Sequence, residues 1–192
     1  YGIRTRYSDD LLWLVYTACR YVEHTGDDRI WDETVPFLSD APLQPGENER
    51  YTKTKESNEK ASLYQHCIRA VERASVFGSH SLPLIGGGDW NDGFNKVGLK
   101  GRGESIWLAW FLYATLEKFI PVCLSQGDQE PVEKYRLIME QIVWASENCA
   151  WDGQWYRRAY NDQGDPLGSV NNSECQIDCI AQAWAVISGA AP

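Results

Sequence analysis

The stretch from about residue 104 to residue 124 constrains the fold most strongly, because it is helical in length and apolar on almost every side. Its large apolar side chains are Ile106, Trp107, Leu108, Trp110, Phe111, Leu112 and Leu116. A helix that lacks a polar face is normally buried. We therefore expect this helix to lie largely inside the protein, and we expect Pro121 to kink or shorten it.

Hydrophobic periodicity predicts further helices on both sides of this segment. The first begins after Ser8, carries a broad apolar face from Leu11 to Val22 and ends at Gly26. Others are expected at residues 28–38, 57–77, 130–148 and 173–188. Residues 39–56 are rich in Pro, Gly and charge and are predicted to be a loop, and residues 151–170 a short β-hairpin or an ordered loop. The predicted fold is all-α, as stacked helical hairpins or an α/α toroid with long functional loops.

The most informative motif lies between two of these helices, at residues 84–98. Gly86, Gly87 and Gly88 lead into Asp89-Trp90-Asn91-Asp92-Gly93, which crowds two carboxylates, an amide and an indole together. A site that cleaves sugars needs an aromatic plate for the pyranose ring, polar groups for the hydroxyls and an acid for the leaving oxygen. A surface turn has a similar content of Gly, Asn and Asp, but it has no reason to carry a tryptophan.

A second polar motif precedes the first helix, at residues 4–13. The simplest interpretation is a capped helix start, and for Ser8 and Asp9 this interpretation is preferred. Arg4 and Asp10 can also point into a cleft at the helix N-terminus, as donor and acceptor for sugar hydroxyls. The spacing alone leaves both interpretations open.

The composition favours a carbohydrate ligand and argues against nucleic acid. The net charge is −9, whereas nucleic-acid binding requires clustered Lys and Arg. The 9 Trp and 10 Tyr suit a cleft for flat, neutral, hydroxylated molecules. The 6 Cys form no CxxC pair, so we expect free thiols in a reducing compartment. The histidines show no metal-ligand spacing, and neither a metal nor a cofactor is expected.

Four segments together resemble the catalytic region of glycoside hydrolase family 94, and the resemblance spans nearly the whole chain. They are Arg4–Trp13, His80–Gly98, Gly101–Phe111 and Pro166–Ala191. The family contains inverting cellobiose and chitobiose phosphorylases and the C-terminal module of cyclic β-1,2-glucan synthases, and these segments look closest to the glucan-synthase and β-1,2-oligoglucan phosphorylase branch. The resemblance implies an (α/α)6 barrel, of which residues 1–192 would be a single segment, incomplete at both ends.

The resemblance also implies roles for individual residues. Asp92 matches the general acid, Trp90 lies at the donor-subsite sugar, and Arg4 and Asp10 bind the hydroxyls of that sugar. Asp89 is a further candidate for substrate binding. Phe94 and Tyr7 depart from the usual Met and Cys of the family, and neither change removes a reacting group.

The acceptor side is less well defined by the sequence. Glu104, Arg157, Arg158 and Tyr160 are candidate acceptor contacts, and each can equally be structural. Glu104 is the member of this group that we include among the substrate-binding residues.

The implied reaction is phosphorolysis, with inorganic phosphate as co-substrate: Asp92 protonates the glycosidic oxygen while phosphate attacks the anomeric carbon from the opposite face. For this role the pKa of Asp92 is expected to be raised, by partial burial beside Trp90 and by the charge of Asp89. Two alternatives remain: a glucoamylase-like inverting hydrolase, and a remnant that binds oligoglucan without turning it over.

The family's phosphate ligands lie beyond the matched segments, so the isolated chain is expected to be weakly active or inactive. Its expected partners are a β-glucan, phosphate and the remainder of the catalytic domain, and uncovered apolar helix faces predict self-association as a further possibility. The expected location is the cytoplasm, or the cytoplasmic face of a bacterial inner membrane if the chain is part of a glucan synthase.

Overall fold

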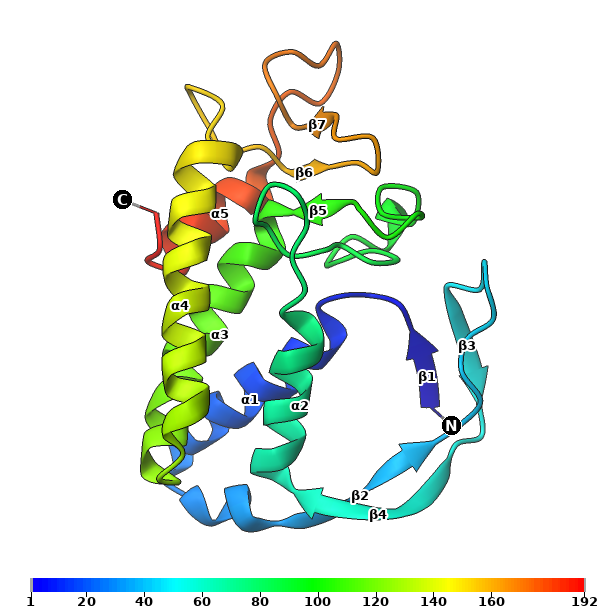
Figure 1. Ribbon diagram of the computed structural model, residues 1–192, viewed down its shortest axis with the longest axis vertical. Coiled ribbons are helices and arrows are strands. Elements are labelled where there is room, and N and C mark those ends of the chain that lie inside the picture. The colour runs from blue at the N-terminus through cyan, green and yellow to red at the C-terminus, as the bar shows by residue number, and fades with distance from the viewer. Residues whose placement is uncertain (1, 192) are drawn as a thin grey trace.

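Within residues 2–191, which the computed structural model describes, five α-helices form the body of the protein (Figure 1). They are α1 (Asp10–Thr25), α2 (Leu63–Ala74), α3 (Ile106–Ser125), α4 (Gln129–Ala145) and α5 (Cys179–Ile187). α3 packs against α1, α4 and α5, and every residue from Ile106 to Leu112 is fully buried. The expected buried helix is therefore confirmed.

α3 does not end or shorten at Pro121, and that part of the prediction is wrong. The helix continues to Ser125, and the fully buried Phe119 and Cys123 flank the proline. Packing of these two side chains holds the last turn in place despite the missing amide hydrogen bond. By length and composition α3 is also long and apolar enough to cross a membrane. A single helix of this kind is weak evidence for a membrane span, since a buried core helix has the same length and composition.

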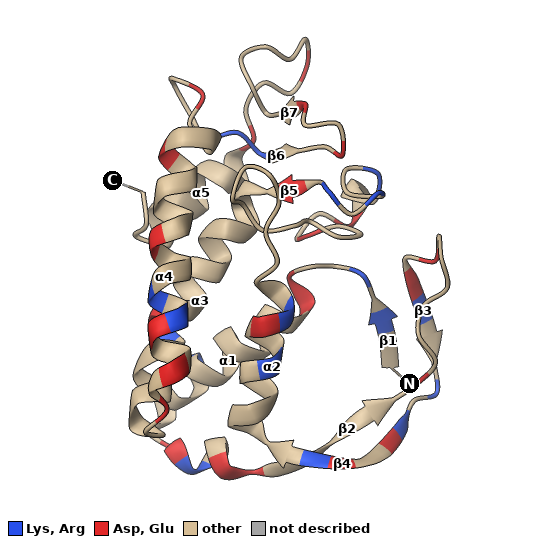
Figure 2. Cartoon of the chain, in the orientation of Figure 1, with Lys and Arg blue, Asp and Glu red and all other residues tan. Residues whose placement is uncertain are grey.

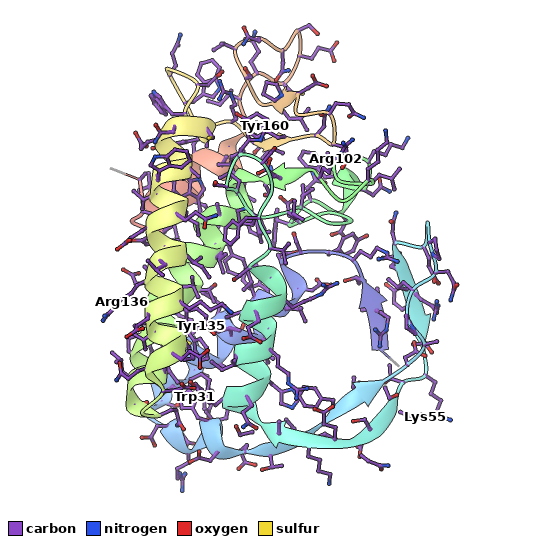
Figure 3. All side chains as sticks on the ribbon, viewed as in Figure 1. Trp31, Lys55, Arg102, Tyr135, Arg136 and Tyr160 are labelled. Atoms are coloured by element: carbon purple, nitrogen blue, oxygen red, sulfur yellow. The ribbon has the colours of Figure 1, made fainter. Side chains whose placement is uncertain are left out.

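Aromatic side chains fill the space between the helices. At one end, Phe119 lies 6.1 Å from Trp31, 5.8 Å from Tyr64 and 6.1 Å from Tyr135, measured between ring centroids. Figure 3 shows Trp31 and Tyr135 at this lower end of the helices. Much of the high aromatic content therefore builds the core.

Three small antiparallel sheets correct the all-α prediction. They pair β1 (Gly2–Thr5) with β3 (Glu49–Thr52), β2 (Thr34–Ser39) with β4 (Lys55–Ser62), and β5 (Glu104–Ser105) with β6 (Ala159–Tyr160) and β7 (Pro166–Leu167). β2 and β4 form a long ribbon that leads away from the helices towards β1 and β3 (Figure 1). The third sheet agrees with the hairpin expected at residues 151–170.

The ribbon of β2 and β4 was missed because it has little apolar alternation. Its register runs from Thr34 opposite Ser62 to Ser39 opposite Lys55, with an irregularity between Pro36 and Leu38. Most residues of β4 are exposed and charged or polar, and Figure 2 marks the acidic and basic positions along the strand. A strand that is solvated on both faces carries no period-2 signal.

Several helix boundaries also differ from the predicted ones. Residues 28–38 form a 3-10 turn (Asp28–Asp32) followed by β2, not one helix. α2 begins only at Leu63, where Ser62 and Gln65 form a reciprocal capping box. α5 begins only at Cys179, because the Asp178 side chain accepts a hydrogen bond from the Ile180 amide at 2.9 Å.

Candidate active site

The glycine-rich loop brings the two sequence motifs together. The Gly87 amide donates to the Arg6 carbonyl at 2.8 Å, and the Ser8 amide donates to the Gly88 carbonyl at 3.0 Å. Gly86 has a φ of +62°, and a Cβ there would lie 2.4 Å from the Arg6 carbonyl oxygen. Only glycine allows this approach. The loop is thereby docked on the segment that leads into α1.

Asp89 anchors the loop from inside. Its carboxylate is 1% exposed and accepts hydrogen bonds from Arg158 Nη1 at 2.7 Å, Arg158 Nη2 at 2.6 Å and Ser105 Oγ at 2.6 Å. It also accepts from the Asn91 amide at 3.0 Å. Every one of these donors lies inside the protein or the loop itself. The structure thus places Asp89 beneath the site, where it supports the loop, and does not place it on the surface that a sugar would contact.

Trp90 lies on the outer side of the same loop, with 59% of the residue exposed. Its ring centroid is 6.1 Å from that of Trp13 and 6.3 Å from that of Trp107. Contacts with these two rings fix the orientation of an indole whose other surface is open to solvent. An exposed aromatic ring held in this way is a suitable platform for a pyranose ring.

Asp92 is the first residue of a 3-10 turn (Asp92–Phe94), which Asn91 caps by accepting from the Gly93 amide at 2.9 Å. The turn directs Asp92 outward, and its side chain is exposed. The surroundings differ from those expected: the residue is exposed, and the charge of Asp89 is balanced by Arg158, which lies 69 residues away in the sequence.

Arg4 and Asp10 flank the loop from the other side. They lie on β1 and at the first position of α1, and both line one cavity of about 540 Å³ together with Tyr7. Burial, followed by the charges of Glu49, Asp92 and Asp10, raises the pKa of the Tyr7 hydroxyl. Asp92 and Asp10 are therefore close enough to act on one phenol. Arg4 donates to the Asp40 carbonyl at 3.3 Å, and Asp10 accepts from Thr5.

The four candidate acceptor contacts are engaged inside the protein. Glu104, 1% exposed, accepts from the His80 amide at 2.9 Å and lies 2.5 Å from His80 Nδ1. Tyr160, which is labelled in Figure 3, stacks on the His80 ring with 3.8 Å between the ring centroids. Arg157 pairs with Asp152. Glu104 is thus almost fully buried, like Arg158, and its two oxygens are hydrogen-bonded to His80; its role in substrate binding stays a prediction.

A cavity of about 540 Å³ lies on the other side of the acid loop, and sequence reasoning missed it. Its polar lining includes Asn91, Asn172, Glu174 and Asp178. The last three lie in the segment before α5, and Glu174 and Asp178 fall within the helix predicted at residues 173–188. Their approach to the loop depends on the fold, and no local pattern in the sequence indicates it.

Asp9 is a buried carboxylate near the site, and burial raises its pKa from the ordinary value of 3.8 to about 6. Because the folded state holds this proton more tightly than the unfolded state, stability falls as the pH rises from about 4 to about 6. We expect Asp9→Asn, which can still accept from Trp13, to raise the free energy of unfolding by about 1–3 kcal/mol at pH 7. Urea denaturation of both proteins at several pH values measures this gain. A gain that is as large at pH 4 as at pH 7 would contradict it.

An exposed indole, an adjacent carboxyl group and nearby Arg and Asp side chains are typical of carbohydrate-active proteins. The family follows from comparison with known proteins. All 192 residues match the family described as "Glycosyl hydrolase 94 superfamily, catalytic domain", and the chain belongs to this family of enzymes.

Individual relatives are consistent with the family. The chain is 43% identical to the cyclic β-(1,2)-glucan synthase NdvB of Rhizobium meliloti, over 98% of this chain and 7% of that protein. It is 33% identical to solabiose phosphorylase and 31% identical to 3-O-β-D-glucopyranosyl-β-D-glucuronide phosphorylase, both from Paenibacillus borealis. The chain spans 22% of the length of each of these two phosphorylases.

Proposed function

We propose that this chain supplies the general acid and the donor-sugar subsite of an inverting phosphorylase, or of the reverse synthetic reaction, that acts on β-glucosidic bonds and in particular on β-1,2-glucan. The observation that carries the proposal is the docking of the loop 86–94 on the segment before α1. This docking supports the proposal because it joins the loop to the segment between Arg4 and Asp10, and because the charges of Asp92 and Asp10 both act on Tyr7 in that segment. The similarity to a glucan synthase supports the choice of glucan.

In the proposed reaction the donor glucosyl unit stacks on Trp90, and Arg4 and Asp10 bind its hydroxyl groups. Asp92 gives its proton to the glycosidic oxygen as the bond to the anomeric carbon breaks. A phosphate oxygen forms the new bond to that carbon from the opposite face, so the products are α-glucose 1-phosphate and a glucan shortened by one unit. The sugar that covers Trp90 would also exclude water from Asp92, which raises the proton affinity of a carboxylate.

The leaving sugar would occupy the cavity lined by Asn91, Asn172, Glu174 and Asp178. Asn91 is the neighbour of Asp92 in the chain, so a sugar in this cavity would lie against the loop that carries the acid. The amide and carboxylate groups of the lining suit hydroxyl recognition. We expect this cavity, and not Glu104, to discriminate between acceptor linkages.

We further propose that the helices belong to an (α/α)6 barrel completed by the remainder of the catalytic domain. Apolar side chains on α4 and α5 are exposed, among them Leu137, Trp144, Val186 and Ile187. Exposed apolar faces of this kind are typically covered in an assembly. Further helices of the same domain, or a second copy of the chain, would cover them. A cytoplasmic location is consistent with this proposal.

Dependence on phosphate tests the proposed reaction. The protein that contains this chain is incubated with β-1,2-glucooligosaccharides with and without inorganic phosphate, and α-glucose 1-phosphate and free glucose are quantified. We expect α-glucose 1-phosphate only when phosphate is present. Free glucose at the same rate in both samples would instead indicate an inverting hydrolase, and binding without turnover would indicate a carbohydrate-binding protein.

The same assay applied to residues 1–192 alone should yield little or no α-glucose 1-phosphate. The reason is that we assign the phosphate-binding residues to another part of the catalytic domain, since the chain spans only 22% of the related phosphorylases. Robust release by residues 1–192 alone would contradict that assignment and place the phosphate site within this chain.

A further inference from the structure

The side chain of Arg158 contacts both ends of the loop that carries Asp92. On one side it makes the two-pronged ion pair with Asp89, at 2.6 and 2.7 Å. On the other side its Cζ atom lies 4.7 Å from the ring centroid of Phe94. Asp89 and Phe94 flank the segment from Trp90 to Gly93 in the sequence. A single guanidinium group therefore closes the base of the acid loop.

Arg158 is itself rigidly held. It is 2% exposed, its amide donates to the Leu167 carbonyl at 2.8 Å, and its carbonyl accepts from the Ile106 amide at 3.2 Å. Its Nε atom lies 3.3 Å from a carboxylate oxygen of Asp178, the residue that caps α5. Arg158 thus connects the loop, through its side chain, to α5 and, through its backbone, to the start of α3 and the sheet of β5–β7.

The position of Asp92 depends on this connection. Because Asp92 is exposed, the backbone of the loop determines where its carboxyl group lies. That backbone is held by the Asn91 amide donating to Asp89 at 3.0 Å and by the Gly93 amide donating to Asn91 at 2.9 Å. The first of these bonds requires the Asp89 carboxylate in the orientation that Arg158 imposes.

We propose that Arg158 is a positioning residue for the general acid: it fixes the loop so that the Asp92 carboxyl group meets the glycosidic oxygen. This inference rests on the proposed function of Asp92. A lysine in place of Arg158 would keep the charge, but an ammonium group cannot bridge both oxygens of Asp89 while it lies flat against Phe94. The exchange Arg158→Lys therefore separates geometry from charge.

A first experiment compares leaving groups in the protein that contains this chain. For a glucan substrate, Arg158→Lys should lower kcat by about 100-fold with KM within about 3-fold, because a displaced acid transfers its proton poorly. For 2,4-dinitrophenyl β-glucoside, whose leaving group needs no proton, the loss should stay below about 3-fold. The control is Arg136→Lys, since Arg136 is exposed on α4, away from the loop (Figure 3), and it should change neither value. Equal losses on both substrates would overturn the proposal.

A second experiment measures the loop directly on residues 1–192 and needs no turnover. In Arg158→Lys the hydrogen–deuterium exchange of the Asn91 and Gly93 amides should accelerate by about 10-fold or more. The control Arg136→Lys should leave both rates unchanged. Phe94→Leu removes the ring contact and keeps the ion pair, so it should give a smaller acceleration even if Arg158→Lys does not fold. Unchanged exchange of these two amides in Arg158→Lys or, if that variant does not fold, in Phe94→Leu would overturn the proposal.

The two inferences can fail separately. Full phosphorolysis by Asp92→Asn would contradict the role of Asp92 as the acid. Faster exchange in Arg158→Lys would then show only that Arg158 anchors the loop. Loss of activity in Asp92→Asn together with wild-type behaviour of Arg158→Lys would leave the proposed function intact and remove the positioning role.

Discussion

Asp92→Asn should abolish phosphorolysis almost completely in the protein that contains this chain. An amide has no acidic proton, so the glycosidic oxygen would leave as an unprotonated alkoxide. Removal of a general acid typically lowers the rate by about 10²–10⁴-fold, and we expect a loss at the upper end because a sugar alkoxide is a poor leaving group. The release of α-glucose 1-phosphate from a β-1,2-glucooligosaccharide measures this loss.

Binding of the glucan should survive the same substitution. Trp90, Arg4 and Asp10 are unchanged in Asp92→Asn, so the dissociation constant, measured by calorimetric titration, should change by less than about 3-fold. Asp165→Asn, an exposed carboxylate in the turn before β7, is a suitable control and should keep its activity. A variant Asp92→Asn with more than a tenth of the wild-type rate would exclude Asp92 as the acid, by the magnitudes known for such groups.

Arg158→Met should strongly destabilise the fold, because it leaves the carboxylate of Asp89 buried without its counter-ion. Breaking a buried ion pair by removal of one partner costs about 3–5 kcal/mol. Urea denaturation of residues 1–192 by circular dichroism measures the change in the free energy of unfolding. Part of the loss should be recovered in the double variant Asp89→Asn/Arg158→Met, because an asparagine side chain carries no charge. Its one oxygen can still accept from the Asn91 amide, and its NH2 group can donate to the Ser105 hydroxyl.

The double-mutant cycle tests whether the two residues act together. A large coupling free energy between Asp89→Asn and Arg158→Met would agree with the geometry of the pair. Losses that simply add would show that Arg158 stabilises the protein through its other contacts, with Phe94 and Asp178. The cycle concerns stability alone and is independent of any activity assay.

The sequence predicted the functional loop better than it predicted the surroundings of the loop. The three glycines, the indole and the carboxylates are adjacent in the chain, so their proximity needs no tertiary information. Whether Asp89 and Glu104 are accessible to a substrate, by contrast, depends on tertiary structure, and both residues are almost fully buried. A buried and an exposed aspartate cannot be distinguished from residue type and spacing when both lie in the same polar turn.

The helices and strands also differ in how much of their formation the local sequence reveals. α3 was recognised because its apolar side chains alone require burial. β2 and β4 were missed because a solvated two-stranded ribbon is stabilised by hydrogen bonds between the two backbones. Such pairing does not require a particular pattern of side chains. Pairing partners such as Thr34 and Ser62 become neighbours only when the chain turns back on itself.

Adjacent residues alone therefore determined the central apolar helix, the backbone freedom of the loop 86–93 and the chemical groups that the loop displays. The tertiary structure decided which of these groups reach solvent, because that depends on partners distant in the chain. The ion pair with Arg158, which lies 69 positions away in the sequence, holds Asp89 in the interior. Trp90 and Asp92 are exposed because the helices and sheets leave that side of the loop uncovered. Charge pairing and burial act through space, and a linear pattern of residues does not contain the distances on which they depend.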